Sequence, residues 1–478
     1  MRSSAEYLEK LAGMRNNVYL DGKASSRTDS RVIRGSKVIQ MTFDLVDDPQ
    51  FEGLLKCKSH LNGETINRFT AIHRCQEDLL LKQEMTRKLC RLTGGCIQRC
   101  MGCDAMNALG VTTRNIDDKY QTDYHQRWFK YLEYFQKNDL VAACAQTDAK
   151  GDRRLRPGEQ PDPDQYLHVV ERRPDGVVVK GAKLHNTMAP YADEIIALPT
   201  RLLGKTERDY AIAFAIPADS PGLYLIGREG SYLSREPGME APISEFGDVE
   251  SFTVFDRVFV PNERIFLDGQ TEFAGELAQL FALYHRHSYC GCKAGMADII
   301  MGTTALVADY LGIEKMGHIK EKLAELISVA ELVYAAGIAS AVKSFKAPSG
   351  SQIPDIIYAN TGRRLAGHNI YHEYQILCEI AGGLPITLPL SKQYNSPEIG
   401  HFIKKYVSRR EGVSPENHYR AAHLASDVLA SEMAVALQIA GVHGGGSPIM
   451  EDIAILSSYD LQEKKNLAKH LAGIKEED

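Results

Sequence analysis

Three cysteines lie within eight residues of one stretch, TGGCIQRCMGCDAM: Cys96, Cys100 and Cys103. If the stretch is helical, Cys96 and Cys100 lie one turn apart on one face, so their thiolates could bind one metal ion or cluster. The spacing matches no standard zinc pattern, because zinc sites favour C-x2-C pairs and only Cys100 and Cys103 form one. The remaining ligands must therefore come from elsewhere in the chain.

A second group of possible ligands lies in YHRHSYCGCKAG, which holds His285, His287, Cys290 and Cys292. We predict that this segment begins a helix, where the peptide dipoles would stabilise thiolates. An iron–sulfur cluster takes cysteine thiolates, and histidine is the recognised substitute. The alternative is that these residues are buried cysteines and surface histidines, and spacing alone leaves both readings open.

The composition is that of an ordinary soluble protein. The chain has 478 residues, 44% hydrophobic and 25% charged, with a net charge of −6, so no general surface for nucleic acid is indicated. No apolar run reaches the ~18 residues of a membrane span, and the first residues lack the apolar region of a secretory signal. We expect a cytoplasmic protein whose ten cysteines stay reduced.

The elements that must position these residues follow the order helices, strands, helices, which predicts an α+β chain. Residues 1–140 are mostly helical with a break at Gly94 and Gly95, residues 141–275 hold short β-rich runs, and residues 276–478 return to helix. We predict three domains with these bounds. A Rossmann domain is disfavoured, because the order is not βαβ and no G-x-G-x-x-G follows a strand.

Three local patterns make sharper predictions. In ESFTVFDRVFVP, Phe252, Val254, Val258 and Val260 share one parity, which predicts one face of a half-buried strand. The residues RPDG predict a hairpin turn. The run AAHLASDVLASEMAVALQIAG predicts one helix that ends near Gly441, before the glycine loop HGGGSP.

Six segments together resemble the 4-hydroxybutyryl-CoA dehydratases, a family within the 4-hydroxyphenylacetate 3-hydroxylase group of flavoproteins. They are TGGCIQRC, TDAKGDR, VESFTVFDRVFVP, YHRHSYCGCK, AGGLPITLP and HGGGSP. The resemblance runs from the N-terminal EYLEKLAGMRNNVYLDGK almost to the end. It implies an acyl-CoA dehydrogenase-like fold with an N-terminal helical domain, a middle β-domain and a C-terminal helical bundle. It also implies FAD, a [4Fe–4S] cluster, an acyl-CoA substrate and a homotetramer.

The resemblance assigns roles to individual residues of this chain. The cluster ligands it implies are Cys96, Cys100, His285 and Cys292, which leaves Cys103 and Cys290 outside the motif. His285 would have a double role, because an imidazole binds iron less firmly than a thiolate and can act as a base once released. Further catalytic residues implied are Gln98, Glu250, Tyr289 and Lys293.

For the flavin, the resemblance implies two groups of residues. Side chains would come from Thr147, Lys150, His185 and Thr187. Backbone amides would come from Gly444, Gly445, Gly446 and Ser447, because glycine lets an anionic group approach the main chain closely.

The implied reaction is FAD- and cluster-dependent radical dehydration of 4-hydroxybutyryl-CoA, or a related hydroxyacyl-CoA, to crotonyl-CoA. The family also suggests vinylacetyl-CoA Δ-isomerase activity. One position departs from the family pattern: a catalytic glutamate precedes the glycine loop there, and this chain has Ala440. Glu432 or Glu451 could replace it only in another register. Two alternatives remain, a flavin-dependent aromatic monooxygenase, which needs no cluster, and a non-catalytic cluster protein.

Overall fold

The computed structural model describes residues 1–228, 238–247 and 249–474. Its α-helices are α1 (Ser4–Gly13), α2 (Ser30–Asp44), α3 (Glu52–Leu55), α4 (Gln76–Thr93), α5 (Cys100–Tyr120), α6 (Tyr124–Lys137), α7 (Thr271–Leu311), α8 (Gly317–Val342), α9 (Ile356–Ala381), α10 (Leu384–Thr387), α11 (Ser391–Tyr394), α12 (Gly400–Val407), α13 (Pro415–Ala430), α14 (Glu432–His443), α15 (Pro448–Ser458) and α16 (Leu461–Leu471).

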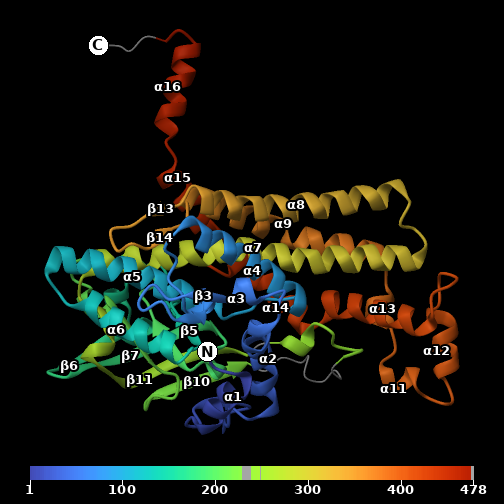
Figure 1. Cartoon of the computed structure of the whole chain (residues 1–478), viewed down its shortest axis with the longest axis horizontal. Helices are drawn as coiled ribbons and strands as arrows, with labels where there is room; N and C mark the ends of the chain where they lie inside the picture. Colours follow the sequence, from blue (N-terminus) through green and yellow to red (C-terminus); the bar gives the residue numbers. More distant parts are fainter. Residues whose placement is uncertain (229–237, 248, 475–478) are drawn as a thin grey trace.

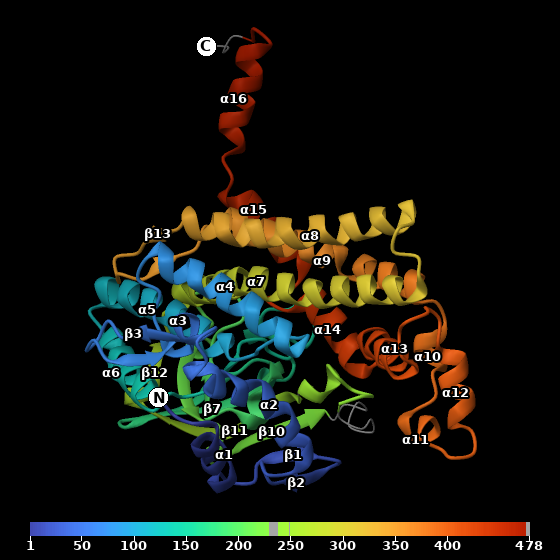
Figure 2. The same ribbon diagram turned by 45° about the vertical axis from the view of Figure 1, so that its right-hand side comes forward.

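Its strands are β1 (Val18–Leu20), β2 (Lys23–Ser25), β3 (Lys56–Lys58), β4 (Thr65–Asn67), β5 (Ala142–Ala145), β6 (His168–Arg173), β7 (Gly176–Thr187), β8 (Glu194–Ala197), β9 (Ile212–Pro217), β10 (Leu223–Arg228), β11 (Glu250–Pro261), β12 (Ile265–Asp268), β13 (Phe345–Lys346) and β14 (Gln352–Ile353). Helices precede and follow the main strands, so the α+β prediction is confirmed. The long helices α7, α8 and α9 lie side by side, and the sheets lie on one side of them (Figures 1 and 2).

The strands form two main sheets that share one core. The larger has the order β2-β1-β10-β11-β7-β6 and the smaller β12-β9-β8-β5. The RPDG hairpin is confirmed, because Arg173 and Gly176 pair across it. Phe214 of β9 packs edge-on against Phe255 of β11, with ring centroids 5.8 Å apart. Since β1 and β2 pair beside β10, the N-terminal part of the chain completes the middle sheet.

The prediction that Phe252, Val254, Val258 and Val260 share one face of β11 is wrong. A β-bulge changes which side chains of the strand are buried. The register against β7 shifts between Phe255 and Val258, and Arg257 has φ +56°, a left-handed conformation that inserts an extra residue into the ladder. Val258 is buried, whereas Phe252 on the same parity is 50% exposed. Before the bulge, the buried parity is that of Phe255.

The predicted helix before the glycine loop is two helices. α13 ends at Ala430, and Ser431 begins α14 by accepting a hydrogen bond from the amide of Ala434, which is the normal action of an N-cap serine. The predicted break at Gly94 is confirmed, because Gly94 ends α4 with φ +64°. That break frees the chain to turn before Cys100, where α5 begins.

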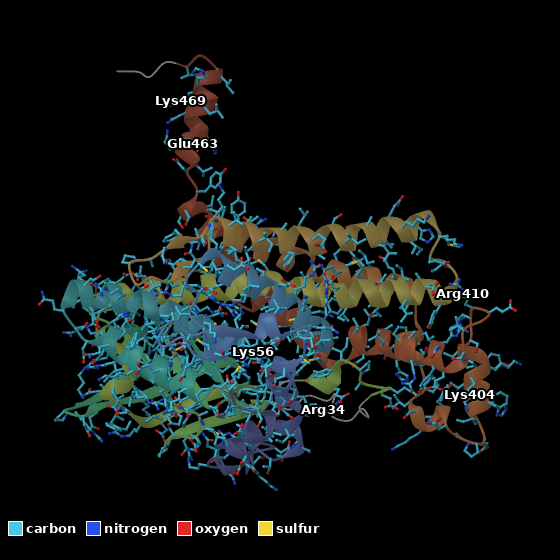
Figure 3. The ribbon with its side chains drawn as sticks, in the orientation of Figure 1. Arg34, Lys56, Lys404, Arg410, Glu463 and Lys469 are labelled. Carbon is cyan, nitrogen blue, oxygen red and sulfur yellow. The ribbon has the colours of Figure 1, made fainter. Side chains whose placement is uncertain are left out.

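One face of α8 and the whole of α16 are exposed in the part of the chain that the structure describes. Among the residues described, α8 is long and apolar enough to cross a membrane, and only 33% of its most apolar window is buried; α13 joined to Glu432–Ser458 passes the same test as one bent span. No uninterrupted apolar run of that length is present in α8, because polar residues divide it. α16 projects from the side of the molecule that carries α8, with Glu463 and Lys469 along it (Figure 3).

Candidate active site

Two helices, α5 and α7, and the loop before α5 bring the predicted cluster ligands together. Cys96 lies in the loop that precedes α5, and Cys100 is the first residue of that helix. His285 and Cys292 lie two turns apart on α7, a helix of 41 residues that starts at Thr271. The prediction that their segment begins a helix is wrong, because the residues before it continue the same helix. The helix N-terminus that does face a thiol is that of α5, at Cys100.

Cys96 is the cysteine whose sulfur accepts hydrogen bonds from two other thiols of the group. Hydrogen bonds from Cys100 and then from Cys292 lower the pKa of the Cys96 thiol well below its ordinary value, although burial raises it. The amide of Gln98 also donates to this sulfur, at 3.3 Å. Hydrogen bonding to Cys96 and burial raise the pKa of Cys100. Three cysteine sulfurs gathered in this way are a donor set suited to a soft metal centre.

A fourth thiol joins this group and was not predicted. Cys90, near the C-terminal end of α4, lies with its sulfur 3.1 Å from that of Cys292. Cys103 instead contacts the carbonyl of Ala71, at 3.4 Å, and Cys290 faces the carbonyl of Ala359, at 3.9 Å. Spacing could not have found Cys90, because it reaches the site through the packing of α4 against α7.

His285 is held by a buried polar network. Its Nδ1 lies 3.1 Å from the carboxylate of Asp104, which also pairs with Lys82 and accepts from Ser288 at 3.0 Å. Burial alone would raise the pKa of Asp104, but the charge of Lys82 and the hydrogen bond from His285 lower it to about 2. The donor atoms of Cys100, Asp104 and His285 all lie within 4.8 Å of one another. Asp104, Lys82 and Ser288 were not predicted; Asp104 could have been noticed one turn after Cys100.

Gln98 offers the site an unused donor. It is fully buried, has φ +61°, and its Oε1 accepts from the hydroxyl of Tyr191 at 2.5 Å. Its Nε2 has no hydrogen-bond partner among the described residues. An unpaired buried amide costs free energy unless a ligand completes it. The left-handed backbone and the orphaned donor are therefore features expected of a residue that meets a bound group.

Tyr289 and Lys293 are committed to contacts of their own. The hydroxyl of Tyr289 donates to the carbonyl of Gly441 at 3.1 Å, and the guanidinium of Arg363 lies 4.4 Å from its ring centroid. Lys293 is buried and pairs with the equally buried Glu373 of α9. In this structure Tyr289 anchors the segment before the glycine loop, and the charge of Lys293 is neutralised.

The predicted flavin residues gather along β7 and the segment beside it. The hydroxyl of Thr187 donates to Glu250 at 2.5 Å, and the carbonyl of Thr147 accepts from the amide of Leu184 at 2.7 Å. Burial, and then the charges of Lys150 and His443, lower the pKa of His185. Lys150 and His185 both have positive φ, +74° and +60°. This arrangement offers cationic and polar groups to an anionic cofactor.

The glycine loop connects this region to the cluster ligands. His443, at the start of the loop, lies close enough to His185 to help lower its pKa. Farther along the loop, a Cβ added to Gly445 would lie 3.5 Å from Cδ2 of His285. Two arginines fix the loop: Arg286 donates to the carbonyl of Gly445 at 3.0 Å and Arg363 to that of Gly444 at 2.9 Å. The loop therefore touches both predicted cofactor sites. Ser447 is the N-cap residue of the next helix, α15.

The position that departs from the family pattern lies on the last turn of α14. Ala440 is exposed, and its carbonyl accepts from the amide of Gly444 at 2.7 Å. Glu432 pairs with Arg228 at 2.9 Å, away from the ligands. Glu451 is buried 3.6 Å from Arg363, and burial raises its pKa. Arg363 and Arg286 both lower the pKa of this carboxyl group. The same two arginines bind the carbonyls of the glycine loop.

Replacing Gly445 with alanine should loosen the loop. Its φ of +84° costs a residue with a Cβ about 1–2 kcal/mol, whereas the new methyl group would only reach van der Waals contact with His285. We expect a lower midpoint in urea unfolding and a lower flavin content in the purified protein. Gly302 of α7 has open space around its Cβ position, so Gly302→Ala should instead stabilise by about 0.5–1 kcal/mol. Equal effects of the two substitutions would contradict this account of the loop.

Family models and a known protein match nearly the full length of the chain. The family model described as the 4-hydroxyphenylacetate 3-hydroxylase N terminal matches residues 3–267, and that of the C terminal matches residues 274–473. The chain is 38% identical to a 4-hydroxybutyryl-CoA dehydratase/vinylacetyl-CoA-Δ-isomerase of Clostridium aminobutyricum, over 99% of this chain and 100% of that protein.

Solved structures give the same result. An oxygen-tolerant archaeal 4-hydroxybutyryl-CoA dehydratase from N. maritimus matches with a TM-score of 0.95 and 38% identity, over 100% of this chain and 96% of the other. The oxygenase component of 4-hydroxyphenylacetate 3-monooxygenase, complexed with FAD, matches with a TM-score of 0.89 and 25% identity, over 98% of each chain. The resemblance found in the sequence is thus confirmed.

Proposed function

The chain belongs to the 4-hydroxyphenylacetate 3-hydroxylase family, and from this premise we propose that it is a dehydratase of the 4-hydroxybutyryl-CoA type. Its reaction would convert 4-hydroxybutyryl-CoA, or a related hydroxyacyl-CoA, to crotonyl-CoA and water, with vinylacetyl-CoA Δ-isomerase activity as a second expectation. The observation that carries the proposal is the meeting of the half-buried Cys96 with the buried Cys100 and Cys292 in one group of thiols beside His285.

The proposal includes the finer structural expectations. We take the fold as acyl-CoA dehydrogenase-like, with domains at residues 1–140, 141–275 and 276–478, in a cytoplasmic enzyme. Cys96, Cys100, His285 and Cys292 would hold a [4Fe–4S] cluster. Thr147, Lys150, His185, Thr187 and the amides of Gly444, Gly445, Gly446 and Ser447 would hold FAD. When bound, the flavin supplies one-electron redox chemistry and the cluster supplies a Lewis-acidic iron.

The chain's own residues would bind the substrate and move its protons. His285, once free of metal, takes a proton from the carbon chain of the substrate. Thr187 donates a hydrogen bond to the carboxyl group of Glu250, which would return a proton to the substrate. The orphaned Nε2 of Gln98 would donate to a substrate oxygen. Tyr289 and Lys293 would act by fixing the loop and α9, because both already have partners.

Anaerobic purification tests the proposal. The protein should contain FAD and about four iron and four sulfide per chain, and should produce crotonyl-CoA from 4-hydroxybutyryl-CoA. Yellow, iron-free protein that hydroxylates phenols with reduced flavin would support the monooxygenase alternative. Zinc without sulfide would contradict the cluster. If the protein contains the cluster but converts a related hydroxyacyl-CoA instead, we would attribute the change of substrate to the region of Ala440. A cluster-containing protein with no activity would support the non-catalytic alternative.

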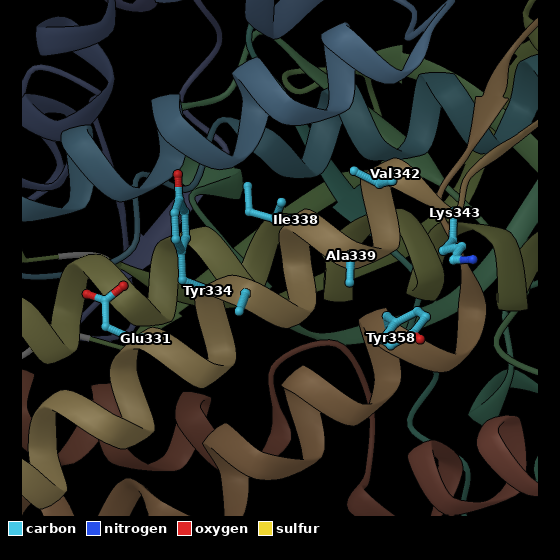
Figure 4. A pocket seen from close by; sticks show the side chains of 8 residues that line it. Glu331, Tyr334, Ile338, Ala339, Val342, Lys343 and Tyr358 are labelled. Carbon is cyan, nitrogen blue, oxygen red and sulfur yellow. The ribbon is translucent and has the colours of Figure 1, made fainter.

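We further propose that the enzyme is a homotetramer whose copies cover α8 and α16. α8 carries exposed Leu332 and Val342, and beside them a shallow cavity of about 440 Å³ is lined by Tyr334, Ile338 and Tyr358 (Figure 4). All residues of α16 are exposed, and a helix of 11 residues is marginal in water by itself. A second copy of this chain would give both surfaces a partner.

Replacing Leu467 and Leu471 of α16 with aspartate should dissociate the assembly. These side chains are 56% and 78% exposed, so their replacement would cost the monomer little, whereas charges would oppose burial between copies. Light scattering after size exclusion should show smaller particles. Gln462→Asp on the same helix should leave the particle mass unchanged. Unchanged mass in the double variant, or a monomeric wild type that binds vesicles, would contradict the proposal.

A further inference from the structure

His285 is held by a carboxylate that the proposed reaction does not use. Asp104 is fully buried and lies on α5, one turn after Cys100. Its partners come from two other helices: Lys82 from α4, and Ser288 and His285 from α7. Three helices therefore converge on one carboxyl group, next to the thiols.

The contacts determine which ring nitrogen of His285 is free. A carboxylate paired with a lysine accepts hydrogen bonds and donates none. Nδ1 of His285, 3.1 Å from Asp104 Oδ2, must therefore carry the hydrogen. In a neutral imidazole the lone pair then belongs to Nε2, the nitrogen left for a metal. The hydroxyl of Ser288, one turn beyond His285 on α7, lies 3.0 and 3.1 Å from the two carboxylate oxygens and 3.0 Å from the carbonyl of Tyr284. Its single hydrogen is shared among these acceptors.

We propose that Asp104 is the positioning residue of His285: it fixes the tautomer and the ring so that Nε2 alone serves as the cluster ligand. The inference rests on the proposed function, because it presumes a cluster. A ligand histidine commonly donates its second nitrogen to a carboxylate, which orients the ring. Here the same contact would also guide the ring back to the metal after substrate has displaced it. Lys82 is the counter-charge that permits a carboxylate at this depth.

The test replaces the ion pair as a unit, so that no buried charge is left unpaired. Lys82→Met with Asp104→Leu removes the acceptor, whereas Lys82→Met with Asp104→Asn keeps a carbonyl oxygen for Nδ1–H. Arg264→Met with Glu194→Gln is the matched control, because it removes another buried ion pair in the β-rich part of the chain. Each protein is prepared anaerobically with ¹⁵N-histidine.

Three measurements are made on each protein: iron and sulfide content with the rate of iron loss to a chelator, nitrogen hyperfine coupling of the reduced cluster by pulsed EPR, and kcat with KM. In the leucine variant we expect lost or altered nitrogen coupling, iron loss about 10- to 100-fold faster, and a lower kcat at unchanged KM. The asparagine variant should recover part of each effect. The control should match the wild type.

The outcomes separate the two proposals. Wild-type nitrogen coupling and iron loss in the leucine variant would overturn the role of Asp104 and leave the cluster standing. A wild-type protein without a cluster, or with one that shows no histidine coupling, would overturn both. If the leucine variant does not fold, Lys82→Met with Asp104→Ala, which also removes the acceptor for Nδ1–H, decides, since wild-type coupling and iron loss there would overturn the role.

Discussion

Replacing Cys96 with serine should abolish cluster assembly and lower dehydration by roughly 10³-fold or more, because Lewis-acid assistance is worth several kcal/mol and each 1.4 kcal/mol is tenfold in rate. The Cys96 sulfur is the one that Cys100, Cys292 and the amide of Gln98 all approach. A serine hydroxyl would not replace a thiolate there. Iron and sulfide per chain and the rate of crotonyl-CoA formation measure the result.

The chain supplies matched controls for this prediction. Cys103→Ser and Cys290→Ser change buried cysteines that lie three and two residues from ligands, but their sulfurs contact the carbonyls of Ala71 and Ala359. Both variants should keep the cluster. Loss of iron from Cys103→Ser, with retention in Cys96→Ser, would show that the assignment of the ligands is wrong.

Replacing Arg99 with methionine should destabilise the protein by about 3–5 kcal/mol, the usual cost of removing one partner of a buried ion pair. Arg99 lies between the two cysteines of the first motif, and both it and Asp139 are almost completely buried. Its guanidinium also donates to Thr42 at 2.9 Å and covers the ring of Phe43 at 4.3 Å. Urea unfolding of the protein measures the change.

Two further variants isolate the cause. Arg99→Met with Asp139→Asn should recover much of the loss, because no unpaired charge remains and asparagine tolerates the positive φ of +46° at residue 139. Arg154→Met removes an arginine of an exposed pair, 88% accessible, and should cost below about 1 kcal/mol. A similar loss in Arg99→Met and Arg154→Met would contradict the importance of burial.

The sequence predicts the candidate site better than its surroundings. Cys96, Cys100, His285 and Cys292 were found because their spacing matches a family motif, and the structure brings them together. Cys90, Lys82 and Asp104 have no motif, since they reach the site only through the packing of α4 and α5 on α7. Long-range packing of this kind leaves no local pattern in a single sequence.

The errors in the predicted secondary structure come from local features that periodicity does not reveal. The order of helices and strands followed from periodicity, and the RPDG hairpin followed from its turn residues. The bulge at Arg257 was missed because parity assumes an unbroken ladder. The break at Ser431 was missed because one N-cap serine is a weak signal within an apolar run, and the start of α7 was placed too late because no cap marks Thr271.

The division of the candidate ligands between α5 and α7 also orders events during synthesis. Cys96 and Cys100 leave the ribosome about 190 residues before His285 and Cys292, which is roughly 10–40 s at the usual rates of translation. During that interval half of the ligand set exists without the other half. Insertion of the cluster is therefore expected to follow completion of the helix that carries the last two ligands, and the early thiols depend on a reducing compartment until then.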